Sequence, residues 1–144
     1  MTNQSVKPPV WFWVVSAIAL LWNLMGVKAY LDQAFMSDDA LAQLEAAVQD
    51  LLNQTPAWVT AAFAIAVWGG ALGSLLLILR KRLAYQVLVV SLIGIIVQMF
   101  YNVFMSGAMD VYGPGGLAMP IMILLFGVGL VWFAKKSISS GWIN

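Results

Sequence analysis

Amide side chains are the residues of this sequence best suited to recognise a ligand. Asn23, Gln98 and Asn102 lie within long uncharged stretches, and each amide offers both hydrogen-bond donors and an acceptor. A helix rises about 1.5 Å per residue. Asn23 and Gln98 therefore each lie about 20 Å from the basic end of their own helix, and at this equal depth the two side chains could meet. An unpaired amide in hydrocarbon costs free energy, so we expect these groups to find partners.

The amides allow two interpretations. In the structural interpretation they bond to one another and lock the register of a helix bundle. In the functional interpretation they line a small polar pocket that has an aromatic wall and suits a neutral hydroxylated or zwitterionic ligand better than a charged one. The candidate ligand-binding residues are then these amides and their aromatic neighbours: Trp22, Asn23, Trp68, Gln98, Tyr101 and Asn102.

Groups for other kinds of chemistry are scarce. The chain has no cysteine and no histidine, and only 9% of its residues are charged. Thiolate and imidazole chemistry are therefore absent, and no nucleophile with a matching base is recognisable, so we predict a protein that is not an enzyme and needs no metal or cofactor. No Asp, Glu, Lys, Arg or His lies deep inside any stretch long enough to cross a membrane, and this absence argues against coupling to protons. A net charge of +1 leaves no basic excess for nucleic acid.

The elements that must position the amides are membrane-spanning helices. The chain is 62% hydrophobic, and its charges leave four long uncharged stretches, each with the roughly 20 residues that a helix needs to cross a bilayer. The sequence therefore predicts an all-α integral membrane four-helix bundle that forms a single domain over residues 1–144. The spans are expected near residues 10–30, 57–79, 84–106 and 117–135.

Prolines and glycines mark the ends of these spans. Pro9, Pro56 and Pro120 fall at or near expected helix starts, where the missing N–H costs little. The run Gly113 to Gly116, which includes Pro114, predicts a short turn between the third and fourth spans.

The basic residues predict the orientation. One side of the spans carries nearly all of them: Lys7, Arg80, Lys81, Arg82, Lys135 and Lys136. The other side carries only Lys28, so the positive-inside rule places both termini in the cytoplasm. The acidic residues then fall in the periplasmic segment 31–56 and at Asp110.

The periplasmic segment is expected to form one short amphipathic helix. Ser37 can cap its start, and Asp38 and Asp39 suit the positive end of the helix dipole. Apolar residues then recur at helical spacing: Leu41, Leu44, Val48 and Leu51. This stripe either packs on the bundle end or rests in the head-group layer, or it forms a lid or docking element.

Small residues repeat on the second predicted span. They are Ala62, Ala66, Gly70 and Ser74 at four-residue spacing, with Gly69 and Gly73 forming a GxxxG pair. A neighbouring helix can approach closely along this small-residue ridge. The neighbour is either another helix of the same chain or a helix of a second copy or partner protein.

Three segments resemble an uncharacterised family of small four-helix inner-membrane proteins of Gram-negative bacteria, some of which are labelled sugar transporters. They are Trp22-Asn23-Leu24-Met25-Gly26, the run from Thr55 to Lys81, and Ser91-Leu92 with Gly94 and Gln98 to Asn102. The resemblance covers most of the chain. It implies a four-helix protein of the bacterial inner membrane, and it implies no catalytic or binding residues.

These features predict a non-enzymatic membrane protein that acts by helix–helix association, as a homo-oligomer or an accessory subunit. The small-residue ridge and the lack of buried ionisable groups favour this function. The alternative is a small neutral-solute carrier or sensor with a polar site in the outer half of the bundle. The expected partners are membrane lipids, a second copy or a membrane protein, and, in the alternative, a small neutral solute.

Overall fold

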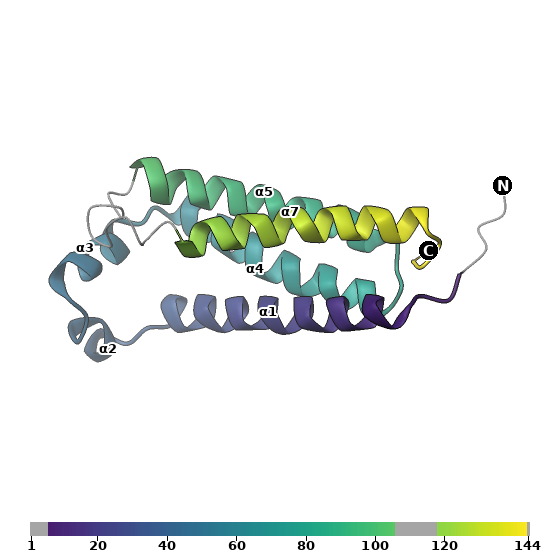
Figure 1. Cartoon of the computed structure of the whole chain (residues 1–144). Coiled ribbons are helices and arrows are strands. Elements are labelled where there is room, and N and C mark those ends of the chain that lie inside the picture. Colours follow the sequence, from purple (N-terminus) through teal and green to yellow (C-terminus); the bar gives the residue numbers. More distant parts are fainter. Residues whose placement is uncertain (1–5, 106–117, 144) are drawn as a thin grey trace.

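The computed structural model describes residues 6–105 and 118–143, and every regular element in these ranges is a helix (Figure 1). The elements in chain order are α1 (Val10–Ala34), α2 (Asp38–Ala42), α3 (Ala46–Gln54), α4 (Ala57–Ile78), α5 (Leu83–Phe100), the π-helix η1 (Tyr101–Met105) and α7 (Ala118–Ser139). Four helices are long and apolar enough to cross a membrane: α1, α4, α5 with η1, and α7. The predicted all-helical class is confirmed, and the described residues include four helices with the length and apolar composition that the prediction requires.

The helix bounds lie close to the predicted ones, with two informative differences. α1 continues past residue 30 to Ala34, and α7 continues past residue 135 to Ser139. The predicted ends were placed near charged residues, which mark where a chain leaves hydrocarbon, not where its helix stops. Pro9 and Pro56 are the N-cap residues of α1 and α4, as expected.

The long helices run side by side along the molecule, with α2 and α3 beyond one end (Figure 1). Their main contacts follow chain order: α1 packs on α4, α4 on α5, and α5 on α7. We call the end where Val6 and Ile143 lie the terminal end, and the other the α2–α3 end. A buried hydrophobic core lies toward the terminal end, where the ring centroid of Phe12 is 5.6 Å from that of Phe133 and 5.9 Å from that of Trp142.

Arg80 joins both chain ends to α4. It follows the C-cap of α4 with a positive φ of 58°, in the hydrogen-bond pattern that closes many helices. Its Nε donates to the carbonyl of Trp142 at 2.7 Å, and its second guanidinium nitrogen donates to the carbonyl of Val6 at 3.0 Å. We call this set of contacts the Arg80 bridge.

The segment between α1 and α4 departs from the prediction. The Ser37 cap is confirmed, because the amide of Ala40 donates to Ser37 Oγ at 3.1 Å. However, two short helices replace the single expected helix, with a break between Ala42 and Ala46. The Gln49 side chain donates to the carbonyl of Leu44 at 2.7 Å, which satisfies an acceptor that the break leaves without a helical partner. The expected apolar stripe is half-buried but interrupted, because Leu41 lies on α2, Leu44 lies in the break, and Val48 and Leu51 lie on α3.

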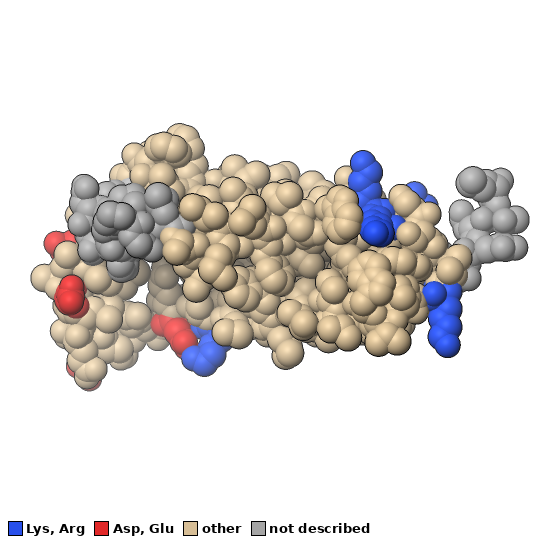
Figure 2. Space-filling model, in the orientation of Figure 1, with Lys and Arg blue, Asp and Glu red and all other residues tan. Residues whose placement is uncertain are grey.

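Charge is segregated to the two ends of the molecule. Figure 2 shows Lys and Arg at the terminal end, Asp and Glu near the α2–α3 end, and an uncharged band between them. Lys28, at the acidic end, pairs with Asp32 at 2.7 Å. The uncharged band matches the membrane-crossing length of the helices. The predicted turn at 113–116 and Asp110 lie outside the described residues.

Candidate binding cavity

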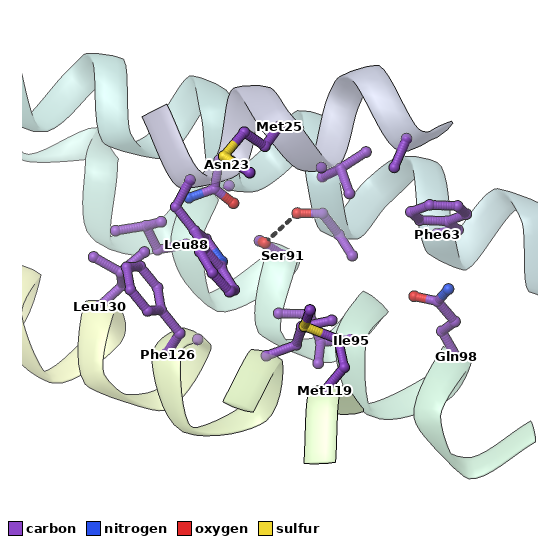
Figure 3. Close-up of a pocket in the computed structure, with 18 residues that line it drawn as sticks. Asn23, Met25, Phe63, Leu88, Ser91, Ile95, Gln98, Met119, Phe126 and Leu130 are labelled. Atoms are coloured by element: carbon purple, nitrogen blue, oxygen red, sulfur yellow. Dashed lines mark hydrogen bonds between the residues drawn. The ribbon is translucent and has the colours of Figure 1, made fainter. Parts of the chain in front are cut away.

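A cavity of about 340 Å³ lies between the four long helices (Figure 3). We call it the interhelical cavity. Its lining residues extend from the middle of these helices toward the α2–α3 end. Every long helix contributes to its wall: α1 through Met25, α4 through Phe63, α5 through Ile95 and α7 through Phe126. Its wall is mostly apolar, and the amides of Asn23 and Gln98 and the hydroxyl of Ser91 interrupt it. None of the described lining residues is charged.

Asn23 holds α1 against α4. Its Nδ2 donates to the carbonyl of Ala19 at 2.8 Å and to Ser74 Oγ at 3.4 Å. Its carbonyl oxygen Oδ1 lies against Gly70, where any Cβ atom would overlap it. The glycine is therefore required by the position of the Asn23 side chain, and Oδ1 is left as an acceptor at the cavity wall.

Ser91 holds α5 against α4. Its hydroxyl donates to the carbonyl of Ala66 at 2.6 Å, and both residues are buried and line the cavity (Figure 3). The two helices approach closely here, because a Cβ on Gly94 would lie 2.8 Å from the carbonyl oxygen of Ala62. Sequence reasoning did not include Ser91 among the candidates, although it stands seven residues before Gln98 on the same helical face.

Gln98 lies at the opposite end of the cavity from Asn23 (Figure 3). Its side chain is half-buried, and its amide has no hydrogen-bond partner within residues 6–105 and 118–143. The expected contact between Asn23 and Gln98 is absent from this described part of the chain, because α4 lies between α1 and α5 and supplies Ser74 to Asn23 instead. The amides therefore share one cavity without bonding to each other.

Of the aromatic candidates, only Trp22 lines the cavity. It stacks on Phe126 of α7 with ring centroids 4.9 Å apart and planes 17° apart. Trp68 is on the outer surface of α4 with 48% of its area exposed. Sequence reasoning missed Phe126, which the spacing of apolar residues on α7 does not distinguish from its neighbours.

Tyr101 and Asn102 are not among the lining residues. Tyr101 is buried elsewhere, where its hydroxyl donates to the carbonyl of Gln54 at 3.4 Å and its ring meets Trp58 edge-on at 5.6 Å. Both residues belong to η1, whose π-helical turn changes the angular spacing of side chains after Phe100. Tyr101 stands seven residues after Gly94, which packs against Ala62 of α4, so Tyr101 lies on the face of the helix turned toward α4 and not toward the cavity.

The small-residue ridge of α4 packs inside the chain. Its four members, Ala62, Ala66, Gly70 and Ser74, are all buried. Gly70 faces Asn23 of α1, and a Cβ on Gly73 would lie 2.6 Å from the Leu88 side chain of α5. α1 and α5 therefore occupy the close-approach surface that the sequence left open to a second copy.

Comparison of the chain with protein-family models, with curated proteins and with solved structures finds no match.

Proposed function

We propose that this chain is a non-enzymatic, multi-pass membrane protein that binds a small uncharged molecule in the interhelical cavity. One observation carries the proposal: a cavity of about 340 Å³ in the membrane-crossing part of the bundle holds an amide, Gln98, that the described residues leave without a partner. Buried polar groups are normally hydrogen-bonded, so a polar group kept free in such a cavity is available to a ligand.

The composition of the wall supports an uncharged ligand. Asn23 Oδ1 can accept a hydrogen bond, and the Gln98 amide can both donate and accept. No described lining side chain could neutralise an ion, and an unpaired charge at this depth would be costly. The stacked rings of Trp22 and Phe126 add a flat apolar surface against which a ligand can pack.

Action through association along the α4 ridge is less well supported. Its motivating feature was a surface that lets another helix approach closely, and α1 and α5 occupy that surface. A carrier built on this cavity would still need a second copy to complete a pathway, since four spans are few for alternating access. Binding, as in a sensor or one half of a carrier, is the function that the geometry favours.

The proposed location is the inner membrane of a Gram-negative bacterium, with both termini in the cytoplasm and α2 and α3 in the periplasm. The basic residues at the terminal end support this orientation through the positive-inside rule. The resemblance of three segments to a bacterial inner-membrane family supports the compartment.

Native mass spectrometry of the protein in native lipid particles tests the binding proposal. We expect a bound small molecule on the wild type, and its loss from Gln98→Leu, because an unpaired ligand group costs about 1–3 kcal/mol. Gln86→Leu is the matched control, since Gln86 is an exposed residue of the same helix and does not line the cavity. An identical small-molecule mass profile for the wild type and both variants would contradict the proposal.

A further inference from the structure

We propose that the interhelical cavity opens sideways into the bilayer, between α1 and α7, and that its ligand is an uncharged amphiphile dissolved in the membrane. This inference rests on the proposed binding function and adds a route and a chemical class. The ligand would carry an apolar body and one hydrogen-bonding head such as a hydroxyl.

The exposure of the wall locates the opening. The exposed lining residues lie only on α1 and α7: Met25, with 69% of its area exposed, Ala29, and Met119, with 56% exposed. The described lining residues of α4 and α5 are all buried or half-buried. The cavity therefore faces outward along the seam between the first and last spans.

The packing order explains why this seam is open. α1 rests mainly on α4, and α7 rests mainly on α5, so α1 and α7 are not each other's principal neighbours. Aromatic rings join them at the terminal end, where Phe12 meets Phe133 at 5.6 Å, and at mid-height, where Trp22 stacks on Phe126. Nearer the α2–α3 end, Tyr30 of α1 turns its ring to Phe63 of α4 instead.

The position of the opening points to the bilayer as the source of the ligand. Met25 lies within the first membrane-crossing helix, one turn before Lys28, whose pair with Asp32 marks the polar boundary. The opening thus faces hydrocarbon just below the head-group layer. The Trp22–Phe126 stack lies one turn deeper and can serve as the floor.

The rim and wall fit an amphiphile. Methionine side chains at the rim, Met25 and Met119, are unbranched and flexible, so they can adapt to an apolar body as it passes. Inside, Gln98 and Asn23 Oδ1 offer hydrogen bonds that lipid tails cannot supply. An uncharged molecule with one polar head gains these bonds and keeps its apolar surface out of water.

A photolabelling experiment on the full chain in phosphatidylcholine vesicles tests the ligand class. The probe is decanol carrying a diazirine, and the matched probes are decane and decyltrimethylammonium with the same photoreactive group. We expect decanol to label cavity peptides containing Trp22 or Phe126, with labelling reduced roughly tenfold in Gln98→Leu and unchanged in Gln86→Leu. Equal labelling by the decane probe would overturn the proposal that the ligand is an amphiphile, since it would mean that lipid chains simply fill the cavity.

A cross-link tests the route. The chain has no cysteine, so Met25→Cys with Met119→Cys can be bridged across the opening by bifunctional maleimides of increasing reach. We expect bridging before the probe is added to abolish the cavity labelling that the same double variant shows when each cysteine instead carries a monofunctional maleimide. Undiminished labelling of the bridged protein would overturn sideways entry and leave the binding function standing. If the unbridged protein showed no cavity labelling and its native mass profile were unchanged by Gln98→Leu, both sideways entry and the binding function would be overturned.

Discussion

The side-chain carbonyl of Asn23 on α1 lies directly against the Cα of Gly70 on α4. Because the same side chain donates to Ser74 Oγ at 3.4 Å, this contact fixes both the spacing and the register of the two helices. The small residue and the amide thus act as one unit. The interhelical cavity begins at this contact, since both residues line its wall.

Gly70→Ala should destabilise the bundle by about 1–3 kcal/mol, because the new Cβ overlaps Asn23 Oδ1 and forces α1 to move. Thermal unfolding in detergent measures the loss. Gly129→Ala is the control, because a Cβ at that position meets nothing within 4 Å, and it should be neutral or stabilise by up to about 1 kcal/mol. The double variant Asn23→Ala with Gly70→Ala should recover part of the loss. Equal stability of the two glycine variants would contradict the contact.

Asn23→Leu and Gln98→Leu should differ in stability although both remove an amide from the cavity wall. Asn23→Leu loses the bonds to Ala19 and Ser74, and should cost about 1–3 kcal/mol. Gln98→Leu removes an amide that bonds to no described residue, so it should leave unfolding unchanged or raise the midpoint. Unfolding curves in the same detergent compare them. A large destabilisation by Gln98→Leu would show that Gln98 has a structural role.

Arg80→Lys should loosen both chain ends. A lysine ammonium lacks the planar fork with which Arg80 reaches the carbonyls of Trp142 and Val6, at 2.7 and 3.0 Å. The positive φ of 58° remains, so any change reports the side chain and not the backbone. We expect faster protease cleavage within the C-terminal residues after α7. Arg82→Lys changes an exposed arginine nearby and should be cleaved at the rate of the wild type. Equal cleavage rates for the wild type and both variants would refute the Arg80 bridge.

Single cysteines test the proposed orientation, because the chain has none of its own. Asp39→Cys should react with a membrane-impermeant maleimide on intact bacterial spheroplasts, and Lys7→Cys should react only after the membrane is opened. Both positions are exposed in the folded chain, so burial does not protect either one. The reverse pattern would invert the orientation and place the basic terminal end outside.

Several features could be predicted from the sequence because they depend on local composition. The uncharged stretches predict four helices long and apolar enough to cross a membrane, in which each backbone bonds within its own helix, and the structure has four such helices. Pro9, Pro56 and Ser37 mark helix starts through their own backbone or side-chain chemistry. Asn23, Gln98 and Trp22 stand out as unusual residues within long apolar stretches, and all three line the cavity.

Other features were decided only when the helices packed. Periodicity shows which residues share a face of one helix, but not which helix faces them, so Asn23 bonds Ser74 and not Gln98. In the same way, Tyr101 shares the face of Gly94 that is turned toward α4, so it meets Gln54 and Trp58 and not the cavity. The cavity itself exists because α1 and α7 each pack on another helix, and such a space is a property of the assembled bundle that no single segment contains.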